Sequence, residues 1–196
     1  MYKRINITEN SLRVFSLFTN GFDKDYYIRE VEKLLTISPR TAQLILEDLE
    51  SKGLIESKAR GKIKLYRLKI NSTSRRYLAF AEQYKAISFL ASNLLIKEAI
   101  EKITPFISGI GIIFGSYAKG TADKGSDLDI FVAGAYDENE IKKVSRNLGL
   151  DISVKCYPEG AFEKNKGKDV LLGQILKNHV IFKNIEQFIE AVLENG

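Results

Sequence analysis

The segment at residues 126–132, Ser-Asp-Leu-Asp-Ile-Phe-Val, alternates carboxylates with apolar side chains. Successive side chains of a β-strand project to opposite faces. A strand here therefore sends Leu128, Ile130 and Val132 into a core and leaves Asp127 and Asp129 together on the other face. Two like charges beside a core repel each other, and a divalent cation is the natural compensation. The segment predicts a strand with a metal-binding carboxylate pair; the alternative is a polar edge strand with two solvated aspartates.

A short apolar run upstream, residues 110–114, ends at Gly115 and Ser116. A buried strand that stops at a small residue and enters a short helix can bind phosphate. Glycine admits close backbone approach there, and the serine hydroxyl and free N–H groups donate hydrogen bonds. Lys119 follows in the same short helix and is a candidate for neutralising phosphate charge. Gly-Ser pairs are common in loops, so the pair gains weight only from the carboxylates downstream.

A second alternating segment lies at residues 150–156. As a strand it places Asp151, Ser153 and Lys155 on one face and apolar residues on the other. Residues 137–147 between the two segments have the pattern of a helix, which predicts a strand-helix-strand unit.

The two motifs together closely resemble the signature of the nucleotidyltransferase superfamily of DNA polymerase beta type, especially its minimal nucleotidyltransferase branch. The resemblance covers about residues 90–185. It implies that Gly115 and Ser116 hold a nucleoside triphosphate, expected to be ATP, and that Asp127 and Asp129 bind two catalytic Mg²⁺ ions. Transfer of a nucleoside monophosphate to an acceptor hydroxyl is the activity that it implies.

Active members of this superfamily carry a third carboxylate on a neighbouring strand, which completes the metal site and helps to activate the attacking hydroxyl. The best match is Asp151, although its distance in sequence from Asp129 is shorter than in many members. The weaker alternatives are Glu159, Glu163 and Asp169.

The first 70 residues have a different pattern. Helices are expected at residues 10–19, 25–35 and 39–52, the last opened by Ser38 as N-cap and Pro39 at the first helical position. Alternating segments at residues 54–59 and 62–68 then predict a half-buried hairpin, with Ile63 and Leu65 on one face and Tyr66 on the other.

Three helices followed by a basic hairpin resemble a winged helix-turn-helix domain. The resemblance implies that Arg40, Thr41 and Gln43, early in the third helix, reach base edges of duplex DNA. The cations of the hairpin are then expected to bind phosphates: Lys58, Arg60, Lys62 and Lys64. The alternative is a winged helix used only for dimerisation or domain packing.

Charge supports a nucleic-acid partner for this part of the chain. Residues 1–70 contain 14 Lys and Arg against 9 Asp and Glu, whereas the remainder contains 16 of each, so the whole excess of +5 lies in the first segment. Cys156 and His179 are the single cysteine and histidine, so a metal site must use oxygen ligands, and His179 is interpreted as structural. No apolar run suggests a signal peptide or a membrane span, and a cytoplasmic protein is expected.

The expected fold class is α+β, with domains at residues 1–71 and 72–196 and a mixed sheet in the second. A helix at residues 72–103 is expected to link them, with an apolar stripe that buries more than one side. We expect it to pack under the sheet and either to contact the winged helix or to form the interface of a homodimer.

Three functions remain open at this point. The first is a transferase that acts on nucleic acid, a small molecule or a toxin-like protein partner. The second is a nucleotide-sensing transcription regulator or an antitoxin-like repressor. The third is a structural protein with a decayed site.

Overall fold

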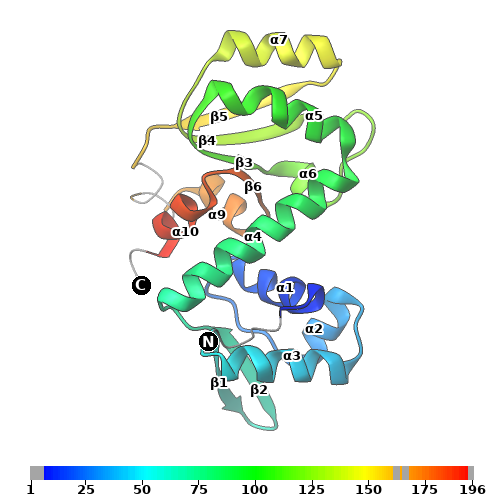
Figure 1. Ribbon diagram of the computed structural model, residues 1–196, viewed down its shortest axis with the longest axis vertical. Coiled ribbons are helices and arrows are strands. Elements are labelled where there is room, and N and C mark those ends of the chain that lie inside the picture. Colours follow the sequence, from blue (N-terminus) through cyan, green and yellow to red (C-terminus); the bar gives the residue numbers. More distant parts are fainter. Residues whose placement is uncertain (1–6, 161–163, 165–167, 194–196) are drawn as a thin grey trace, which may run out of the picture. The chain divides into compact units, whose positions relative to one another are not determined.

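The computed structural model describes residues 7–160, 164 and 168–193 (Figure 1). The chain divides into two compact units, Met1–Ala81 (unit 1) and Glu82–Gly196 (unit 2). The division falls inside helix α4 (Ser72–Ser92), whereas the sequence pattern placed it before this helix.

From residue 7 onward, where the structure describes it, unit 1 contains three short helices and a two-stranded hairpin before α4. Side-chain caps start two of the helices, because Thr8 accepts from the amide of Ser11 and Ser38 accepts from the amide of Thr41. The elements are α1 (Glu9–Ser16) with a 3-10 turn (Leu17–Thr19), α2 (Ile28–Leu35), α3 (Pro39–Ser51), β1 (Ile55–Arg60) and β2 (Ile63–Leu68).

The start of α2 differs from the expected position at residue 25. Tyr26 forms an isolated β-bridge with Tyr66, in which each amide donates to the other's carbonyl, at 2.8 and 2.7 Å. Because this pairing needs extended backbone, the helix begins only at Ile28.

The hairpin alternates as predicted, but its buried face is the one that contains Tyr66. Tyr66 and Leu68 are almost fully buried, whereas Ile63 is 49% exposed. The apolar core of unit 1 therefore includes the base of the hairpin but not Ile63 near its tip.

The long helix expected at residues 72–103 is two helices, α4 and α5 (Leu94–Ile103). At Asn93 the backbone leaves the helical region, and the side-chain amide donates to the carbonyl of Phe89 at 2.8 Å. The break rotates the second helix, so Leu94, on the expected apolar stripe, is 72% exposed while Ile96 is buried. The prediction of one continuous buried stripe was wrong at this point.

Unit 2 is built on a four-stranded mixed sheet with the order β5-β4-β3-β6, which confirms the expected mixed sheet. β4 pairs with β5 in parallel, and β3 pairs with β4 and β6 in antiparallel orientation. The predicted strand-helix-strand unit is β4-α7-β5. Element bounds are β3 (Ile107–Ile113), α6 (Gly115–Lys119), β4 (Leu128–Tyr136), α7 (Glu138–Leu148), β5 (Ile152–Tyr157), α9 (Val170–Lys177), β6 (Val180–Lys183) and α10 (Ile185–Leu193), with a 3-10 turn at Thr104–Phe106.

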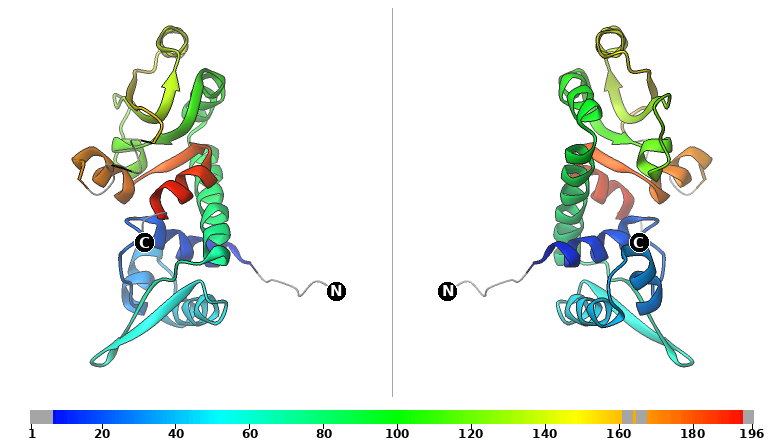
Figure 2. Two further views of the ribbon diagram at one scale, coloured as in Figure 1. Left: turned by 90° about the vertical axis from the view of Figure 1, so that its left-hand side faces the viewer. Right: turned by 90° about the vertical axis from the view of Figure 1, so that its right-hand side faces the viewer.

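Helices cover both faces of this sheet. One face packs against α5 and α7 in a core that contains Leu128, Ile130 and Val132. Figure 2 shows α9 on the side of the sheet opposite α5. Phe131, whose side chain points to that second face, is also fully buried. The described part of the chain contains no helix long and apolar enough to cross a membrane.

Candidate functional site

The carboxylate pair lies where β4 begins. Asp127 is exposed and immediately precedes the strand, and Asp129 is its second residue and half-buried. Leu128 and Ile130 are fully buried on the other face. The alternation in the sequence thus gives the expected separation of carboxylates from core.

Gly115 lies directly against Asp129. A Cβ atom at residue 115 would come within 2.0 Å of Asp129 Oδ2, so a glycine is the one residue that fits without displacing the carboxylate. Its φ of +70° is in the left-handed region, which also favours glycine. The amide of Phe114 donates to the carbonyl of Asp129 at 3.0 Å and holds the two segments in register. The Gly-Ser turn and the carboxylate pair are therefore one site.

The turn continues into α6, which contains Ser116 and Lys119. The carbonyl of Ser116 accepts from the amide of Thr121 at 3.0 Å, which closes the C-terminal end of this short helix. The Ser116 hydroxyl makes no hydrogen bond with the described residues, so it is available to a ligand.

A second closed turn positions Asp127. Asp123 Oδ1 accepts from the amide of Gly125 and from the Ser126 hydroxyl, each at 3.0 Å, while Ser126 Oγ accepts from the amide of Asp123 at 2.9 Å. These bonds hold the pKa of Asp123 below its usual value. Asp123 was not among the predicted site residues, although Asp-Lys-Gly-Ser is recognisable as a turn in which a carboxylate binds the following amides.

β5 places Ser153 beside Asp129. The parallel register pairs Leu128 with Ile152 and Asp129 with Ser153. Asp151 lies one residue before β5, and its carbonyl accepts from the amide of Leu128 at 2.8 Å. Asp151 is therefore near the start of β4, on the side of Asp127. The residue of β5 directly beside Asp129 is Ser153, and this pairing was not predicted from the sequence.

The charges around Asp129 oppose one another. Burial raises the pKa of Asp129 and the neighbouring Asp127 raises it further, whereas Lys155 and Lys119 lower it. Both lysines thus lie close enough to act on the carboxylate, although neither forms an ion pair with it among the described residues. A doubly charged cation would relieve the repulsion between the two aspartates.

The alternative third carboxylates have other roles where the structure describes them. Asp169 caps α9 by accepting from the amide of Leu172 at 3.0 Å, and it also accepts from the Tyr157 hydroxyl at 2.6 Å. Glu159 accepts from the Gln187 side chain at 2.9 Å. Glu163 lies outside the described residues.

Within the described ranges, no three Asp, Glu, His or Cys side chains gather closely enough to hold a metal ion. Mg²⁺ does not need such a cage, because it commonly takes one or two carboxylates together with substrate phosphates and water. The crowded pair Asp127 and Asp129, beside a turn suited to phosphate, provides that donor set.

In unit 1, the early residues of α3 are engaged to different degrees. Arg40 is exposed, and its guanidinium donates to Gln43 Oε1 at 3.3 Å; Gln43 in turn donates to Glu47 at 2.8 Å. Thr41 is half-buried, and its hydroxyl is hydrogen-bonded to the capping Ser38 at 2.8 Å. Arg40 is thus the most exposed of the three predicted contacts, and Thr41 and Gln43 are both half-buried.

The cations of the hairpin also fall into two groups. Lys64 forms an ion pair with Glu50 of α3 at 2.7 Å, and its ammonium lies 5.0 Å from the centre of the Tyr66 ring. Lys58, Arg60 and Lys62 are exposed and have no ion pair within the described part of the chain. The structure therefore leaves these three free to bind phosphate and partly neutralises Lys64.

His179 belongs to a buried ionic group away from the carboxylate pair. Glu82 accepts from the Lys85 ammonium at 2.7 Å and lies 3.4 Å from His179 Nε2, while His179 Nδ1 is 2.9 Å from the carbonyl of Ile175. Burial alone would raise the pKa of Glu82, but Lys85 and His179 outweigh it and lower that pKa to about 2. The interpretation of His179 as structural agrees with this position.

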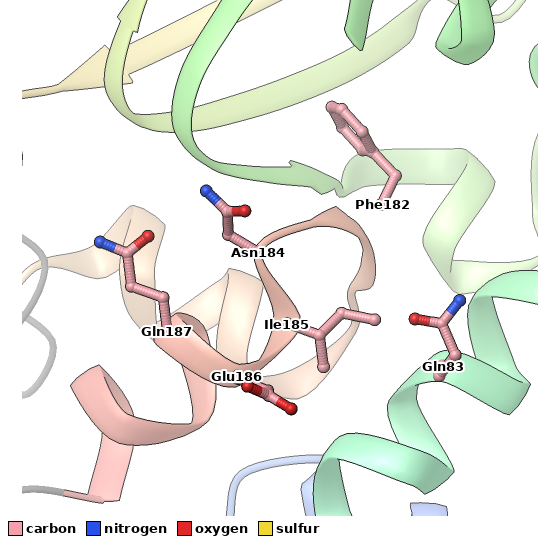
Figure 3. Close-up of a pocket in the computed structure, with 6 residues that line it drawn as sticks. All are labelled: Gln83, Phe182, Asn184, Ile185, Glu186 and Gln187. Atoms are coloured by element: carbon pink, nitrogen blue, oxygen red, sulfur yellow. The ribbon is translucent and has the colours of Figure 1, made fainter.

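A cavity of about 540 Å³ lies beside β6, α10 and the unit 2 part of α4. Phe182 fills the space where a Cβ of Gly111 would lie, and Gly111 pairs with Val132, whose side chain points away from the face of Asp129. Figure 3 shows Ile185 extending toward Gln83 of α4 across this cavity. It is lined by Gln83, Phe182, Asn184, Ile185, Glu186 and Gln187, and it is separate from the candidate site.

The nucleotidyltransferase domain family matches residues 95–194, just over half of the chain, and the chain belongs to that family. The matched range contains the Gly-Ser turn, the carboxylate pair and Asp151.

Two relatives are similar over different extents. A CCA-adding enzyme of Thermoplasma volcanium is 43% identical over 49 residues, which are 25% of this chain and 11% of that enzyme. A solved structure of TrmBL2, described as an archaeal chromatin protein with a novel mode of DNA binding, is 14% identical. It aligns with a TM-score of 0.30 over 86% of this chain and 69% of that chain, and a score this low does not establish a common fold.

Proposed function

We propose that unit 2 transfers a nucleoside monophosphate from a nucleoside triphosphate to an acceptor hydroxyl in the presence of Mg²⁺. The observation that carries the proposal is the contact between Gly115 and the carboxylate of Asp129. It joins a turn suited to phosphate with a carboxylate pair suited to a metal, and phosphoryl transfer requires both at one place.

Each residue has a part in this reaction. Mg²⁺ bound to Asp127 and Asp129 would neutralise charge on the triphosphate and orient it. The Ser116 hydroxyl and the amides of the Gly115 turn hold the leaving phosphates, and Lys119 adds positive charge beside them. A carboxylate oxygen of Asp151, one residue before β5, accepts the proton of the acceptor hydroxyl. The acceptor oxygen bonds to the α-phosphorus while the bond from that phosphorus to the β-phosphate breaks, and pyrophosphate leaves.

Unit 1 is proposed to bind duplex DNA as a winged helix. Its α3 presents Arg40 and Gln43 for contacts with bases, and the hairpin presents Lys58, Arg60 and Lys62 for contacts with phosphates. The excess positive charge of the first 70 residues supports this proposal.

The test is transfer of label from each of the four α-labelled ribonucleoside triphosphates, with Mg²⁺ and total cell extract. Label on RNA, on a protein band or on a small molecule identifies the acceptor, and Asp129→Asn serves as the inactive comparison. Absence of metal-dependent transfer to any acceptor would reject the proposal.

A second candidate is a nucleotide-sensing DNA-binding regulator. The observation in its favour is that the residue of β5 paired with Asp129 is Ser153, which carries a hydroxyl where a third carboxylate would favour catalysis. Nucleotide binding that changes DNA affinity, without label transfer in the same extract, would support this function over catalysis.

A further inference from the structure

The strand order gives the carboxylate pair two different neighbours. β4 lies between β3 and β5. On the β3 side, Gly115, Ser116 and Lys119 form the turn assigned above to the triphosphate. On the β5 side, Asp151, Ser153 and Lys155 share the face of Asp129, because paired residues of parallel strands point the same way. If the donor nucleotide occupies the first side, the acceptor must approach from the second.

Lys155 is the single cation of β5. It is exposed, pairs in register with Phe131, and acts electrostatically on Asp129. Among the described residues it has neither a hydrogen bond nor an ion pair. Other lysines of unit 2 form ion pairs, such as Lys102 with Glu98 at 2.7 Å and Lys142 with Glu138 at 2.6 Å.

This free ammonium has a consequence for the acceptor. Asp151 makes the approach from β5 negative, which repels an anionic acceptor and leaves a neutral one unaffected. The Lys155 ammonium lies on the same face, two positions beyond Ser153, and offsets that repulsion. It would do so for a negatively charged group of the acceptor next to the attacking hydroxyl.

We propose that Lys155 is a specificity residue that binds a phosphate carried by the acceptor, next to the hydroxyl that receives the nucleotide. This inference rests on the proposed transferase function. The acceptor is then a phosphate-bearing molecule, either a polynucleotide end or a small phosphorylated compound, in preference to an uncharged protein hydroxyl.

The experiment compares full-length wild type, Lys155→Gln and the control Lys142→Gln, an exposed lysine of α7 in the same unit. The acceptors are a ribotrinucleotide, the same trinucleotide with an uncharged methylphosphonate at its terminal linkage, and a sugar phosphate beside its free sugar. Wild type should prefer the charged acceptor in at least one of these two pairs. A preference within the trinucleotide pair indicates a polynucleotide acceptor, and a preference within the sugar pair indicates a small phosphorylated acceptor. Lys155→Gln should raise the acceptor KM about tenfold or more and remove the preference, with the KM for triphosphate unchanged.

Binding provides a readout that does not need turnover. Anisotropy of the fluorescent trinucleotide, with a non-hydrolysable triphosphate and Mg²⁺ present, should show weaker binding by Lys155→Gln than by Lys142→Gln. Any contribution of unit 1 is common to both variants and cancels. Equal binding, equal use of charged and uncharged acceptors, or a raised KM for triphosphate alone would overturn the assignment of Lys155. A wild-type protein that transfers to no acceptor, yet shows the binding difference, would reject the transferase function and leave the phosphate site standing.

Discussion

The carboxylate of Asp129 occupies the space that any side chain at residue 115 would need, since a Cβ there would lie 2.0 Å from Asp129 Oδ2. Two residues separated by the α6 turn and a loop thus form one close contact. Under the proposed function, this contact makes the glycine of the Gly-Ser turn a structural requirement of the metal site.

Gly115→Ala should therefore remove nucleotide transfer and lower stability by more than its backbone strain alone. The matched control is Gly120→Ala, because Gly120 has the same φ of +70° but nothing within 4 Å of an added Cβ. The control should cost about 1 kcal/mol, the expense of the left-handed conformation. Urea unfolding and transfer assays on both variants measure the difference, and equal effects would contradict the contact.

Under the proposed function, Asp127→Asn and Asp129→Asn should each reduce transfer by about 100-fold or more while the fold is retained, because each removes a charge proposed to bind the metal. Glu138→Gln, at an exposed residue of α7, is the control and should retain activity. Circular dichroism checks the fold. Full activity with unchanged Mg²⁺ dependence in either Asp variant would reject the site.

The buried group of Glu82, Lys85 and His179 predicts a loss of stability in acid. The pKa of Glu82 is lowered from 4.5 to about 2 in the folded protein, so its stabilisation is fully present above pH 4.5 and disappears as pH falls toward 2. The difference corresponds to about 3 kcal/mol. Urea unfolding midpoints measured between pH 6 and pH 2, followed by circular dichroism, should show this decline.

Glu82→Gln should flatten that decline and destabilise the protein at neutral pH by about 3 kcal/mol, since it leaves the partly buried Lys85 without its counter-charge. Glu98→Gln is the comparison, because Glu98 pairs with Lys102 at the surface and its loss should cost less than about 1 kcal/mol. Equal destabilisation by the two substitutions would show that the buried group contributes no more than a surface pair.

Lys62→Ala and Lys64→Ala should have different effects on the salt dependence of duplex DNA binding. Lys62 has no ion pair in the described structure, so its loss should reduce the salt dependence of binding by about one released counterion. Lys64 is paired with Glu50 at 2.7 Å, so its loss should change the slope less and affect the stability of unit 1 instead. A salt series of DNA binding measures both slopes, and no binding by wild type at low salt would reject the DNA-binding proposal.

The parts of the structure that follow from local chemistry could be predicted from sequence. The strand at Leu128, the glycine turn at Gly115 and the N-cap at Ser38 each depend on a few adjacent residues. The break at Asn93 was missed, because no glycine or proline marks it and the asparagine side chain replaces a backbone interaction of the helix.

Pairing between segments distant in the chain was harder to predict from sequence. The neighbour of Asp129 on β5 depends on the register of two parallel strands, and a shift of two residues exchanges Ser153 for Asp151 with no change in the alternating pattern. The ion pair between Lys64 and Glu50 likewise depends on how β2 packs against α3, which the sequence pattern of neither element specifies. Composition could show that the hairpin is basic but not which cation is already neutralised.

The absence of a side chain at Gly115 also has a thermodynamic meaning. The turn and the Asp129 carboxylate touch without a flexible group between them, so a displacement of one is transmitted to the other. Under the proposed function, a triphosphate that settles the turn also settles the metal-binding oxygen, and metal bound there strengthens the hold on the triphosphate by the same factor. The two ligands are then expected to bind with positive cooperativity, and neither affinity has a fixed value unless the concentration of the other ligand is stated.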